Sequence, residues 1–318
     1  MTADNPFPAI HGRVCYHPCE VACNRADLDG AVSIHSVERY LGDLAIEKGW
    51  TFTRPTEPSG HRVLVIGAGP AGLSAAYHLA MLGHDVEIHD AGDKVGGMMR
   101  YGIPEYRLPR EILDAEVARL TDLGIKIVLN HPVNDLMEEK AKGRFDAVFV
   151  AIGAHLSKRV DIPTVDASRM VDAVSFFLHN VASGEKPLIG RRVAVYGGGN
   201  TAMDAARVAK RLGAEESIVV YRRTAEQMPA HAEEREEAER EGVQMNWLRT
   251  ITDVGDDLTV EVMELDEDGK PHGTGRYEKL EADTVILAVG QDADTSFLHK
   301  MPGMRFRNDV VDVNPSTS

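Results

Sequence analysis

Two glycine-rich turns are the parts of this chain whose residue types and spacing point most directly to chemistry. The apolar run 63–66 leads straight into Gly67, Gly69 and Gly72, which stand at the G-x-G-x-x-G spacing, and a helical pattern follows. In such a turn the first glycine permits the sharp bend, the second lets a pyrophosphate approach the backbone, and the third lets the helix lie against the strand. We therefore predict that an anionic dinucleotide binds at Gly67, Gly69, Pro70, Ala71 and Gly72.

A carboxylate stands where a ribose hydroxyl would need an acceptor. The predicted strand 85–89 ends at Asp90, close to the offset of about 20 residues from Gly67 at which dinucleotide-binding units have an acidic residue. A further buried strand, 147–152, runs into Gly153, where the backbone can approach a ligand closely. The alternative, a glycine turn without a ligand, is less consistent with this full context.

The same pattern of strand, turn and helix restarts further along the chain. Residues 192–196 form a predicted strand that enters Gly197, Gly199 and Ala202, the G-x-G-x-x-A variant of the motif. Because the intervening segments do not repeat at a short period, this is a second nucleotide unit and not a member of a repeat array. The predicted contacts of this unit are Gly197, Gly199, Asn200, Thr201 and Ala202.

Arginines in the second unit replace the carboxylate of the first. The strand 217–221 ends in Arg222 and Arg223, where the first unit has Asp90. Arginine can pair with a 2′-phosphate, and no carboxylate is present there to accept from a free 2′-hydroxyl, so the pattern favours NADP over NAD. Arginines at strand ends are also ordinary surface residues, which is the alternative interpretation.

All three cysteines lie within one short N-terminal segment. Cys15, Cys19 and Cys23 are spaced four residues apart, and this spacing predicts one shared face on a helical turn. Three thiolates that face one way suit a soft metal or an iron–sulfur cluster. Two alternatives stay open, namely three buried structural thiols, or a zinc site that His11 or His17 completes.

The composition limits the class of protein. With 35 lysines and arginines against 50 acidic residues, the formal net charge of −15 argues against a nucleic-acid partner. The sequence has no run of about 18 apolar residues, and its N-terminus has neither a basic segment nor a hydrophobic core, so we expect a cytoplasmic protein with no membrane partner. An odd, clustered set of cysteines favours ligation over a disulfide framework.

Taken together, these motifs resemble those of the small subunit of glutamate synthase and its relatives. These are flavin- and pyridine-nucleotide-dependent oxidoreductases, and they include the large subunit of ferredoxin-NADP transhydrogenase and the N-terminal half of dihydropyrimidine dehydrogenase. The resemblance extends over nearly the whole chain. Besides the glycine turns and the cysteines, it includes the stretches 12–15, 18–20, 101–104, 107–109, 221–223, 228–230 and 288–291.

The resemblance implies an α/β fold with two Rossmann-like dinucleotide-binding domains. An FAD domain with an inserted NAD(P)H domain would follow a small helical iron–sulfur segment. We expect the iron–sulfur segment at 1–57, the FAD-binding domain at 58–165 and 282–318, and the NAD(P)H-binding domain at 166–281.

The resemblance also implies a cofactor for each part of the chain. FAD is expected on the first glycine turn, NADPH or NADH on the second, and a 4Fe-4S cluster at the cysteines. Glu38 matches the position at which some relatives supply a fourth, non-cysteine ligand, although alone it would count as a surface helix residue. By resemblance, the candidates for catalytic positions beside flavin or nicotinamide are Gly102, Arg107 and Gln291, and the further cofactor contacts are Gly97 and Gly290.

The implied function is that of an FAD-dependent NAD(P)H oxidoreductase subunit. It would pass electrons between NAD(P)H, FAD and an iron–sulfur cluster or a larger catalytic or iron–sulfur partner subunit. The nucleotide units contain no Cys-x-x-Cys, which disfavours a disulfide reductase of the thioredoxin reductase type. Two alternatives are an electron-output module that reduces NAD(P)+ for a partner, and an interaction scaffold that binds no flavin.

The chain departs from the family pattern at both ends. Relatives usually carry another cysteine group upstream and share ligands between two clusters, so we expect at most one cluster here. Relatives also continue beyond a strand at 312–314 into a turn and a helix that hold the flavin. We therefore expect a fragment, an FAD domain that a partner completes, or weakened flavin binding.

Overall fold

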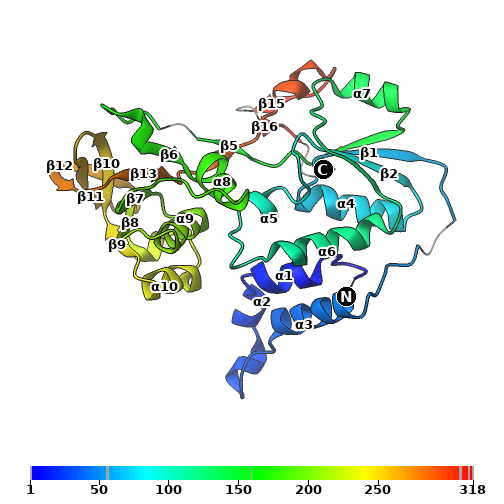
Figure 1. Ribbon diagram of the computed structural model, residues 1–318, viewed down its shortest axis with the longest axis horizontal. Helices are drawn as coiled ribbons and strands as arrows, with labels where there is room; N and C mark the ends of the chain where they lie inside the picture. The colour runs from blue at the N-terminus through cyan, green and yellow to red at the C-terminus, as the bar shows by residue number, and fades with distance from the viewer. Residues whose placement is uncertain (1, 55–56, 159, 308–309, 314–315, 317–318) are drawn as a thin grey trace. The chain divides into compact units, whose positions relative to one another are not determined.

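The structure is a computed structural model that describes residues 2–54, 57–158, 160–307, 310–313 and 316 (Figure 1). The chain divides into two compact units. The first unit comprises Met1–Ala154 and Ala293–Ser318, and the second comprises His155–Asp292. Among the described residues, no helix has both the length and the apolar character that crossing a bilayer requires.

A parallel sheet of four strands forms the centre of the first unit. Its order is β3 (Lys126–Val128), β2 (Asp85–His89), β1 (Arg62–Ile66) and β4 (Ala147–Val150). Successive side chains on a strand point to opposite faces, so an apolar strand such as β1 can serve two cores. Leu64 and Ile66 face one core of buried side chains, and Val65 faces the other.

Helices cover both faces of this sheet. Helices α4 (Pro70–Met81) and α6 (Arg110–Thr121) lie on one side, and α7 (Leu136–Gly143) lies on the other (Figure 1). On the α4 side the core includes Leu73 and Leu113, both fully buried. The glycine turn after β1 is therefore held between a buried strand and a buried helix.

The C-terminal segment packs against the α7 face of the sheet. It contains η5 (Ser296–Lys300) and the short pair of β15 (Phe306–Arg307) and β16 (Val310–Val311). Leu298 in η5 is buried in the same core as Leu64 and Leu136. The segment after the second unit is thus part of the core of the first.

The N-terminal segment is helical, and its first helix packs between α6 and the long helix that ends the segment. Its helices are α1 (Pro8–Val14), α2 (Pro18–Val21), η1 (Asn24–Asp27) and α3 (Ile34–Glu47), and Figure 1 shows α1 between α6 and α3. Two glycines allow α1 and α3 to pack closely. A side chain on Gly42 would collide with the backbone of Ala9, and one on Gly12 would collide with Arg39.

A buried ion pair on α6 clamps this segment to the first unit. Glu116 is fully buried, and it accepts hydrogen bonds of 2.8 Å from the Ala9 backbone N–H and from Arg119. Arg119 donates in turn to the Trp50 carbonyl at 3.0 Å, and its guanidinium lies 4.3 Å from the ring centroid of Phe52. One ion pair therefore holds both ends of the N-terminal segment.

The second unit contains a parallel sheet of five strands. Its order is β6 (Met170–Asp172), β13 (Thr284–Leu287), β7 (Arg192–Tyr196), β8 (Glu216–Tyr221) and β9 (Gln244–Trp247). Helix α9 (Asn200–Arg211) follows β7, and the charge-rich helix α10 (Ala232–Arg240) packs against α9. The side chain of Arg207 in α9 is only 5% exposed, and it pairs with Glu234, Glu237 and Glu241. Ion pairs therefore dock α10 on α9.

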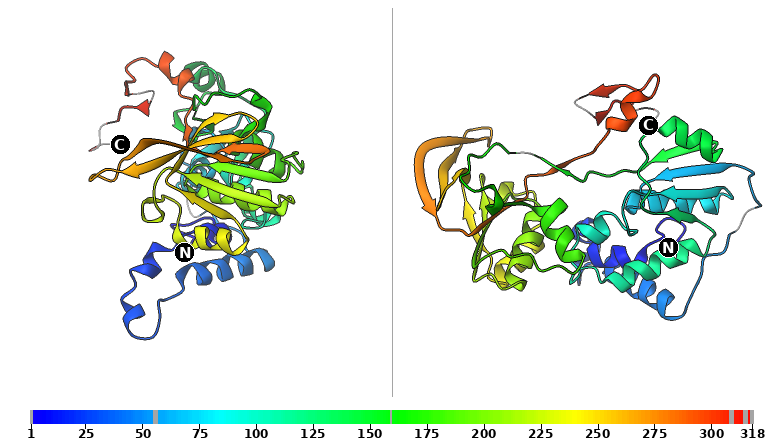
Figure 2. Two further views of the ribbon diagram at one scale, coloured as in Figure 1. Left: turned by 90° about the vertical axis from the view of Figure 1, so that its left-hand side faces the viewer. Right: turned by 45° about the horizontal axis from the view of Figure 1, so that its top comes forward.

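A sheet of three strands and a short pair of strands also belong to the second unit. An antiparallel sheet is formed by β10 (Arg249–Val254), β11 (Leu258–Leu265) and β12 (Pro271–Leu280), as Figure 2 shows. The segments that enter and leave the unit pair with each other as β5 (Leu156–Ser157) and β14 (Gln291–Asp292). The two ends of the second unit are thus hydrogen-bonded neighbours.

The boundaries differ from those expected at 165/166 and 281/282. Strand β13 hydrogen-bonds between β6 and β7, with Val285 opposite both Met170 and Ala194, so it belongs to the second unit. The expected segment 1–57 packs into the first unit. Of the expected segments, residues 1, 55, 56, 159, 308, 309, 314, 315, 317 and 318 lie outside the described residues.

The clamp on α6 can be tested by mutation. Glu116→Ala is expected to lower the free energy of unfolding by about 3 to 5 kcal/mol, because Arg119 is then left buried without its carboxylate. Denaturant unfolding followed by circular dichroism measures the loss. Glu111→Ala, an exposed position on the same helix, is the matched control and should change the free energy by less than about 0.5 kcal/mol. A loss as small as the control's would contradict the clamp.

Candidate functional site

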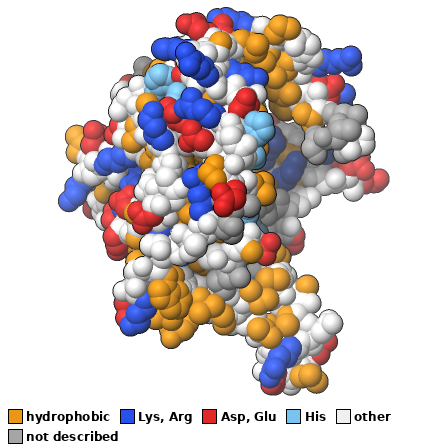
Figure 3. Space-filling model, turned by 90° about the vertical axis from the view of Figure 1, so that its right-hand side faces the viewer, with side chains coloured by type: hydrophobic (Ala, Val, Ile, Leu, Met, Phe, Trp, Pro, Cys, Tyr) orange, Lys and Arg blue, Asp and Glu red, His pale blue; other side chains and the backbone are white. Residues whose placement is uncertain are grey.

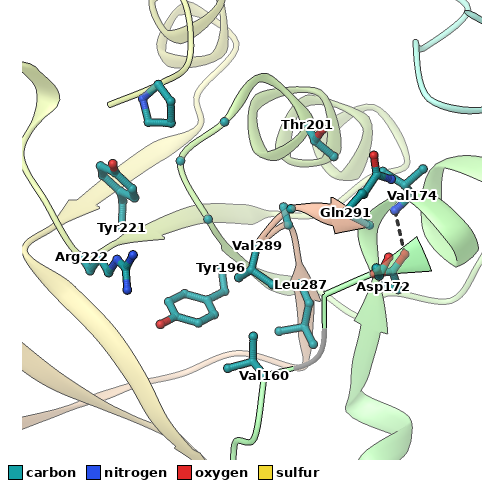
Figure 4. Close-up of a pocket in the computed structure, with 18 of the residues that line it drawn as sticks. Val160, Asp172, Val174, Tyr196, Thr201, Tyr221, Arg222, Leu287, Val289 and Gln291 are labelled. Atoms are coloured by element: carbon teal, nitrogen blue, oxygen red, sulfur yellow. Dashed lines mark hydrogen bonds between the residues drawn. The ribbon is translucent and has the colours of Figure 1, made fainter. Parts of the chain in front are cut away.

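A cavity of about 480 Å³ lies at the carboxyl edge of the parallel sheet in the second unit (Figure 4). Open parallel sheets bind ligands at this edge, because loops diverge there. The lining comes from the ends of four strands, β6, β7, β8 and β13. It includes Asp172, Tyr196, Gly197, Gly198, Gly199, Thr201, Tyr221, Arg222, Arg223, Leu287, Gly290 and Gln291.

The glycine turn forms one wall of this cavity. Gly197 has φ +148°, and a side chain there would collide with the carbonyl of Ala288. At Gly199, by contrast, a Cβ would meet nothing within 4 Å, and no side chain caps the start of α9. The helix N-terminus therefore faces open space, and it offers backbone N–H groups to an anion.

Two buried nitrogen atoms in this region lack partners. The Nε of Arg223 and the Nε2 of Gln291 have no hydrogen-bond partner among the described residues. A buried donor without an acceptor costs about 1 to 3 kcal/mol, so a ligand that accepts from these atoms would gain affinity. Figure 4 shows Arg222 beside Tyr221 on one side of the glycine turn and Gln291 on the other. These residues fit a phosphorylated nucleotide.

Asp172 is a lining residue that the sequence analysis missed. Its Oδ1 accepts hydrogen bonds from the backbone N–H groups of Val174 (3.0 Å) and Ser175 (2.6 Å) (Figure 4). These bonds fix the start of η3 (Ala173–Leu178), a π-helical turn at the cavity wall. The sequence signal that could have identified Asp172 is an aspartate at the end of a strand, directly before a helix.

The first glycine turn repeats this geometry in the first unit. Gly67 has φ +106°, and a side chain there would collide with the carbonyl of Ala151. A side chain on Gly72 would collide with the carbonyl of Gly67, so the helix lies directly against the turn. Gly97 faces the turn as well, because its Cβ would lie 2.9 Å from the Cα of Gly69. The predicted residues Gly67, Gly69, Pro70, Ala71, Gly72 and Gly97 are thus brought together.

Asp90, the predicted ribose ligand, lies beside this turn. Its Oδ2 accepts from the Ala68 N–H at 2.6 Å and its Oδ1 from the Gly92 N–H at 2.7 Å. Each oxygen keeps a further lone pair for a hydroxyl. Gly153 follows β4 with φ +67°, and a Cβ there would meet nothing within 4 Å. Both residues therefore fit a ligand at the carboxyl edge of the first sheet.

Arg107, a candidate catalytic position, contacts the cysteine segment. Its guanidinium lies 5.9 Å from the ring centroid of Tyr16 and donates to the Tyr16 hydroxyl at 3.4 Å. Tyr16 is the neighbour of Cys15. The other candidate in this loop, Gly102, is buried against Met98. The loop after α5 (Met98–Tyr101) thus joins the first glycine turn to the cysteines.

The expectation that the cysteines share one helical face is wrong. Cys15 ends α1, Cys19 lies in α2 and Cys23 precedes η1. The chain turns sharply at His17, which has φ +39°, and Pro18 starts a new helix there. All three thiols are free. Their sulfur atoms form no group of three or more ligand atoms within 4.8 Å of one another among the described residues.

The surroundings of Cys23 suit a thiolate ligand. The backbone N–H groups of Val32, Arg25 and Ala26 near the sulfur lower the pKa of the Cys23 thiol. The sulfur of Cys15 accepts a 3.3 Å hydrogen bond from the His17 N–H. Hydrogen bonds to sulfur are typical of iron–sulfur sites, so this donor set fits a cluster.

Glu38 does not contact the cysteines through any hydrogen bond in the structure. Its carboxylate accepts from the side-chain amide of Asn5, and it lies near His11. Burial lowers the pKa of His11, and the charge of Glu38 opposes that shift. The segment contains a second polar group that the sequence analysis missed, in which Glu20 accepts from the backbone N–H and the Nδ1 of His35.

Comparison with known proteins identifies the classes of domain in this chain. Residues 61–318 match the family described as pyridine nucleotide-disulphide oxidoreductase, and residues 1–50 match the family described as dihydropyrimidine dehydrogenase domain II, 4Fe-4S cluster. The NADP(+)-dependent formate dehydrogenase subunit beta of Moorella thermoacetica is 38% identical over 91% of this chain and 46% of its own length. The chain therefore spans about half the length of this relative.

Two further likenesses extend this result. The glutamate synthase [NADPH] small chain of Escherichia coli K12 is 33% identical over 90% of this chain and 66% of its own length. The structure of FprA from Mycobacterium tuberculosis in complex with NADPH is 19% identical and has a TM-score of 0.62 over 79% of this chain and 74% of its own. At this identity, the FprA structure is evidence for the fold alone.

These matches confirm several expectations from the sequence. The resemblance to the glutamate synthase small subunit and the α/β fold with two nucleotide-binding units are both confirmed. The matched families imply FAD and NAD(P)H as cofactors of an oxidoreductase and a 4Fe-4S cluster in the N-terminal segment. Several relatives are named as subunits of larger enzymes.

The open space at Gly199 can be tested by filling it. Gly199→Val is expected to weaken NAD(P)H binding by about tenfold or more, because the side chain occupies the place where a pyrophosphate approaches the backbone. Titration calorimetry measures the affinity. The variant should fold, with a loss of stability below about 1 kcal/mol for the poorer helix cap. Gly197→Val is the contrasting variant, and it should unfold because of its positive φ. Unchanged affinity in Gly199→Val would contradict the assignment.

Proposed function

The chain belongs to the pyridine nucleotide-disulphide oxidoreductase family, and we propose that it works there as an electron-input subunit. It would take electrons from NADPH and deliver them to a larger partner subunit, with FAD and a 4Fe-4S cluster as its cofactors. When bound, nicotinamide and flavin supply hydride transfer and the cluster supplies single-electron transfer, which no side chain provides. The task of the protein is to bind and orient these groups.

The second unit would bind and select the nucleotide. The backbone at Gly197 and Gly199 would hold the pyrophosphate at the start of α9, and Arg222 and Arg223 would pair with the 2′-phosphate. Support comes from the unpartnered Nε of Arg223 and from the absence of an ion pair between either arginine and a described carboxylate. Gln291 would orient the amide group of the nicotinamide, and this hydrogen bond would satisfy its buried Nε2.

The first unit would bind the flavin nucleotide. The turn at Gly67 and Gly69 would hold its pyrophosphate, with Gly97 across from it and Asp90 on the ribose. Support comes from the close backbone packing around this turn, which leaves no room for side chains on Gly67 or Gly72. Gly153 and Gly102 would line the part of the site in which the flavin ring system lies, along the sheet edge.

The contact between Arg107 and Tyr16 is the observation that carries the electron-transfer proposal. It joins the loop that faces the first glycine turn to the residue beside Cys15. Cys15, Cys19 and Cys23 would be the thiolate ligands, and Glu38 would be the fourth ligand after exchanging its partner Asn5. Electrons could then leave the flavin site through a segment that packs on the same unit.

Exposed apolar side chains support a partner at the N-terminal segment. Figure 3 shows hydrophobic side chains gathered over the lower part of the first unit, where this segment lies. Large exposed apolar patches mark interaction surfaces. This patch comprises Val21, Leu28, Val32, Ile34, Val37, Tyr40 and Leu41, of which Leu28 is 86% exposed. We propose that the larger subunit docks here, next to the cysteines, and that the complex is cytoplasmic, where free thiols persist.

An absorption spectrum tests the function as a whole. The anaerobically purified chain should show flavin bands and a broad iron–sulfur shoulder, with bound iron in a chemical assay. Addition of NADPH should bleach the flavin bands. A folded protein that shows neither chromophore would contradict the proposal and favour an interaction scaffold.

Nucleotide choice is tested by replacing both arginines. The double variant Arg222→Gln, Arg223→Gln is expected to lower kcat/KM for NADPH by about tenfold to a hundredfold, because a hydrogen bond to a charged group contributes about 1.5 to 3 kcal/mol. The value for NADH should change less than about threefold. Steady-state reduction of an artificial dye measures both. Arg276→Gln, an exposed arginine on β12 that pairs with Glu264, is the matched control. Equal losses with both nucleotides would refute the phosphate contact.

A further inference from the structure

Three metal-ligand side chains meet in the first unit, on the sheet face that carries α7. His89 ends β2, His131 follows β3, and Glu139 lies in α7. One ligand atom from each lies within 4.8 Å of the others. The Oε1 of Glu139 is 3.0 Å from the Nδ1 of His89 and 2.9 Å from the Nε2 of His131. Two imidazole nitrogens therefore converge on one carboxylate oxygen.

A fourth residue fixes the proton on His89. The Nε2 of His89 lies 2.9 Å from the Oε1 of Glu87, which also pairs with Lys126 at 3.0 Å. A carboxylate oxygen that also pairs with a lysine accepts this hydrogen bond, so His89 donates to Glu87 from Nε2.

In a neutral imidazole that donates from Nε2, the other nitrogen, Nδ1, carries a lone pair. His89 is only 5% exposed, and its Nδ1 has no hydrogen-bond partner of adequate geometry among the described residues. It faces a carboxylate oxygen, which also offers only lone pairs. Two lone pairs that face each other at 3.0 Å are bridged by a cation, which is either a metal ion or a proton on Nδ1.

We propose that His89, His131 and Glu139 bind a divalent metal ion, zinc in the first place. Two imidazoles and one carboxylate form a ligand set that zinc accepts, with a fourth position left for water. The hydrogen bond from Nε2 of His89 to Glu87 has the arrangement that orients metal-bound histidines through a neighbouring carboxylate. The side chain of His131 is 34% exposed, which gives the ion a path of entry.

The site would hold together the strand end that carries the predicted ribose ligand. The backbone N–H of His131 donates to the carbonyl of Asp90 at 2.8 Å, and His89 is the residue before Asp90. A metal ion would thus fix this strand end to the loop before α7 and to α7 itself. This role is structural and separate from the cysteines, so it does not depend on the proposed electron-transfer function.

Zinc binding by the full chain tests the site directly. The anaerobically purified protein is washed with chelator and titrated with Zn²⁺ against a chromophoric competitor, and iron is counted separately. The wild-type chain should bind zinc at this site. His131→Gln and Glu139→Gln should each lower the affinity by more than about a hundredfold, while Glu87→Gln, which leaves the ligands in place, should lower it about 10- to 100-fold.

Two controls separate this site from others. Glu138→Gln, the exposed neighbour of Glu139 on α7, should leave the affinity unchanged. His35→Gln removes a member of the His17, Glu20 and His35 group, the other set of converging ligand atoms among the described residues, and should leave this zinc bound. Circular dichroism should show every variant folded, and Zn²⁺ should raise the unfolding temperature of the wild type but not of His131→Gln.

Two results would overturn the proposal. The first is a wild-type chain that binds no zinc, which would mean that a second proton on His89 joins the two carboxylates. The second is zinc that stays bound in His131→Gln and Glu139→Gln but is lost in His35→Gln. Co²⁺ in place of zinc supplies an independent signal, because its visible absorption should appear in the wild type and disappear in Glu139→Gln.

Discussion

Both nucleotide-binding units depend on the same steric constraint, the contact of a glycine with the carbonyl at the end of a neighbouring strand. Gly67 meets the carbonyl of Ala151 after β4, and Gly197 meets that of Ala288 after β13. A side chain at either glycine would push the two parallel strands apart and would also have to adopt a positive φ. The start of the helix, its free N–H groups and the space for a phosphate all follow from this contact.

The chain is acidic, yet its charges are arranged so that cations remain at the nucleotide cavity. Many of its carboxylates are used internally: three pair with Arg207, Glu116 holds Arg119, and Glu87 lies between Lys126 and His89. Neither Arg222 nor Arg223 pairs with a described carboxylate. A net charge of −15 therefore does not prevent the recognition of an anionic ligand, because local charge decides the binding.

The sequence predicted the local structural patterns, but it did not predict which distant segments pair with one another. The glycine turns, the helices after them and the arginines at the end of β8 depend on residues close in the chain, and these were predicted at the correct positions. The edge of the second unit was misplaced because β13 joins its sheet through residues far away in sequence. The four-residue spacing of the cysteines favoured one helical face, whereas Pro18 between the first two disfavours an uninterrupted helix, and the chain does start a new helix at Pro18. The group around His89 joins residues from β2 to α7, so sequence spacing alone did not predict it. One sign of it was available, because the polar residues Glu87 and His89 alternate with Val86 and Ile88 in a buried strand.

The pairing of β5 with β14 has a consequence for how the chain folds. It brings Ser157 opposite Gln291, so the second unit enters and leaves through adjacent residues. To the first unit, the whole segment 155–292 is therefore an insertion whose ends are already joined. Closing a flexible loop of that length would cost entropy, but an insertion that folds by itself pays this cost in advance. The core formed by Leu64 and Leu298 can then assemble as though the two parts of its chain were joined by a short connection.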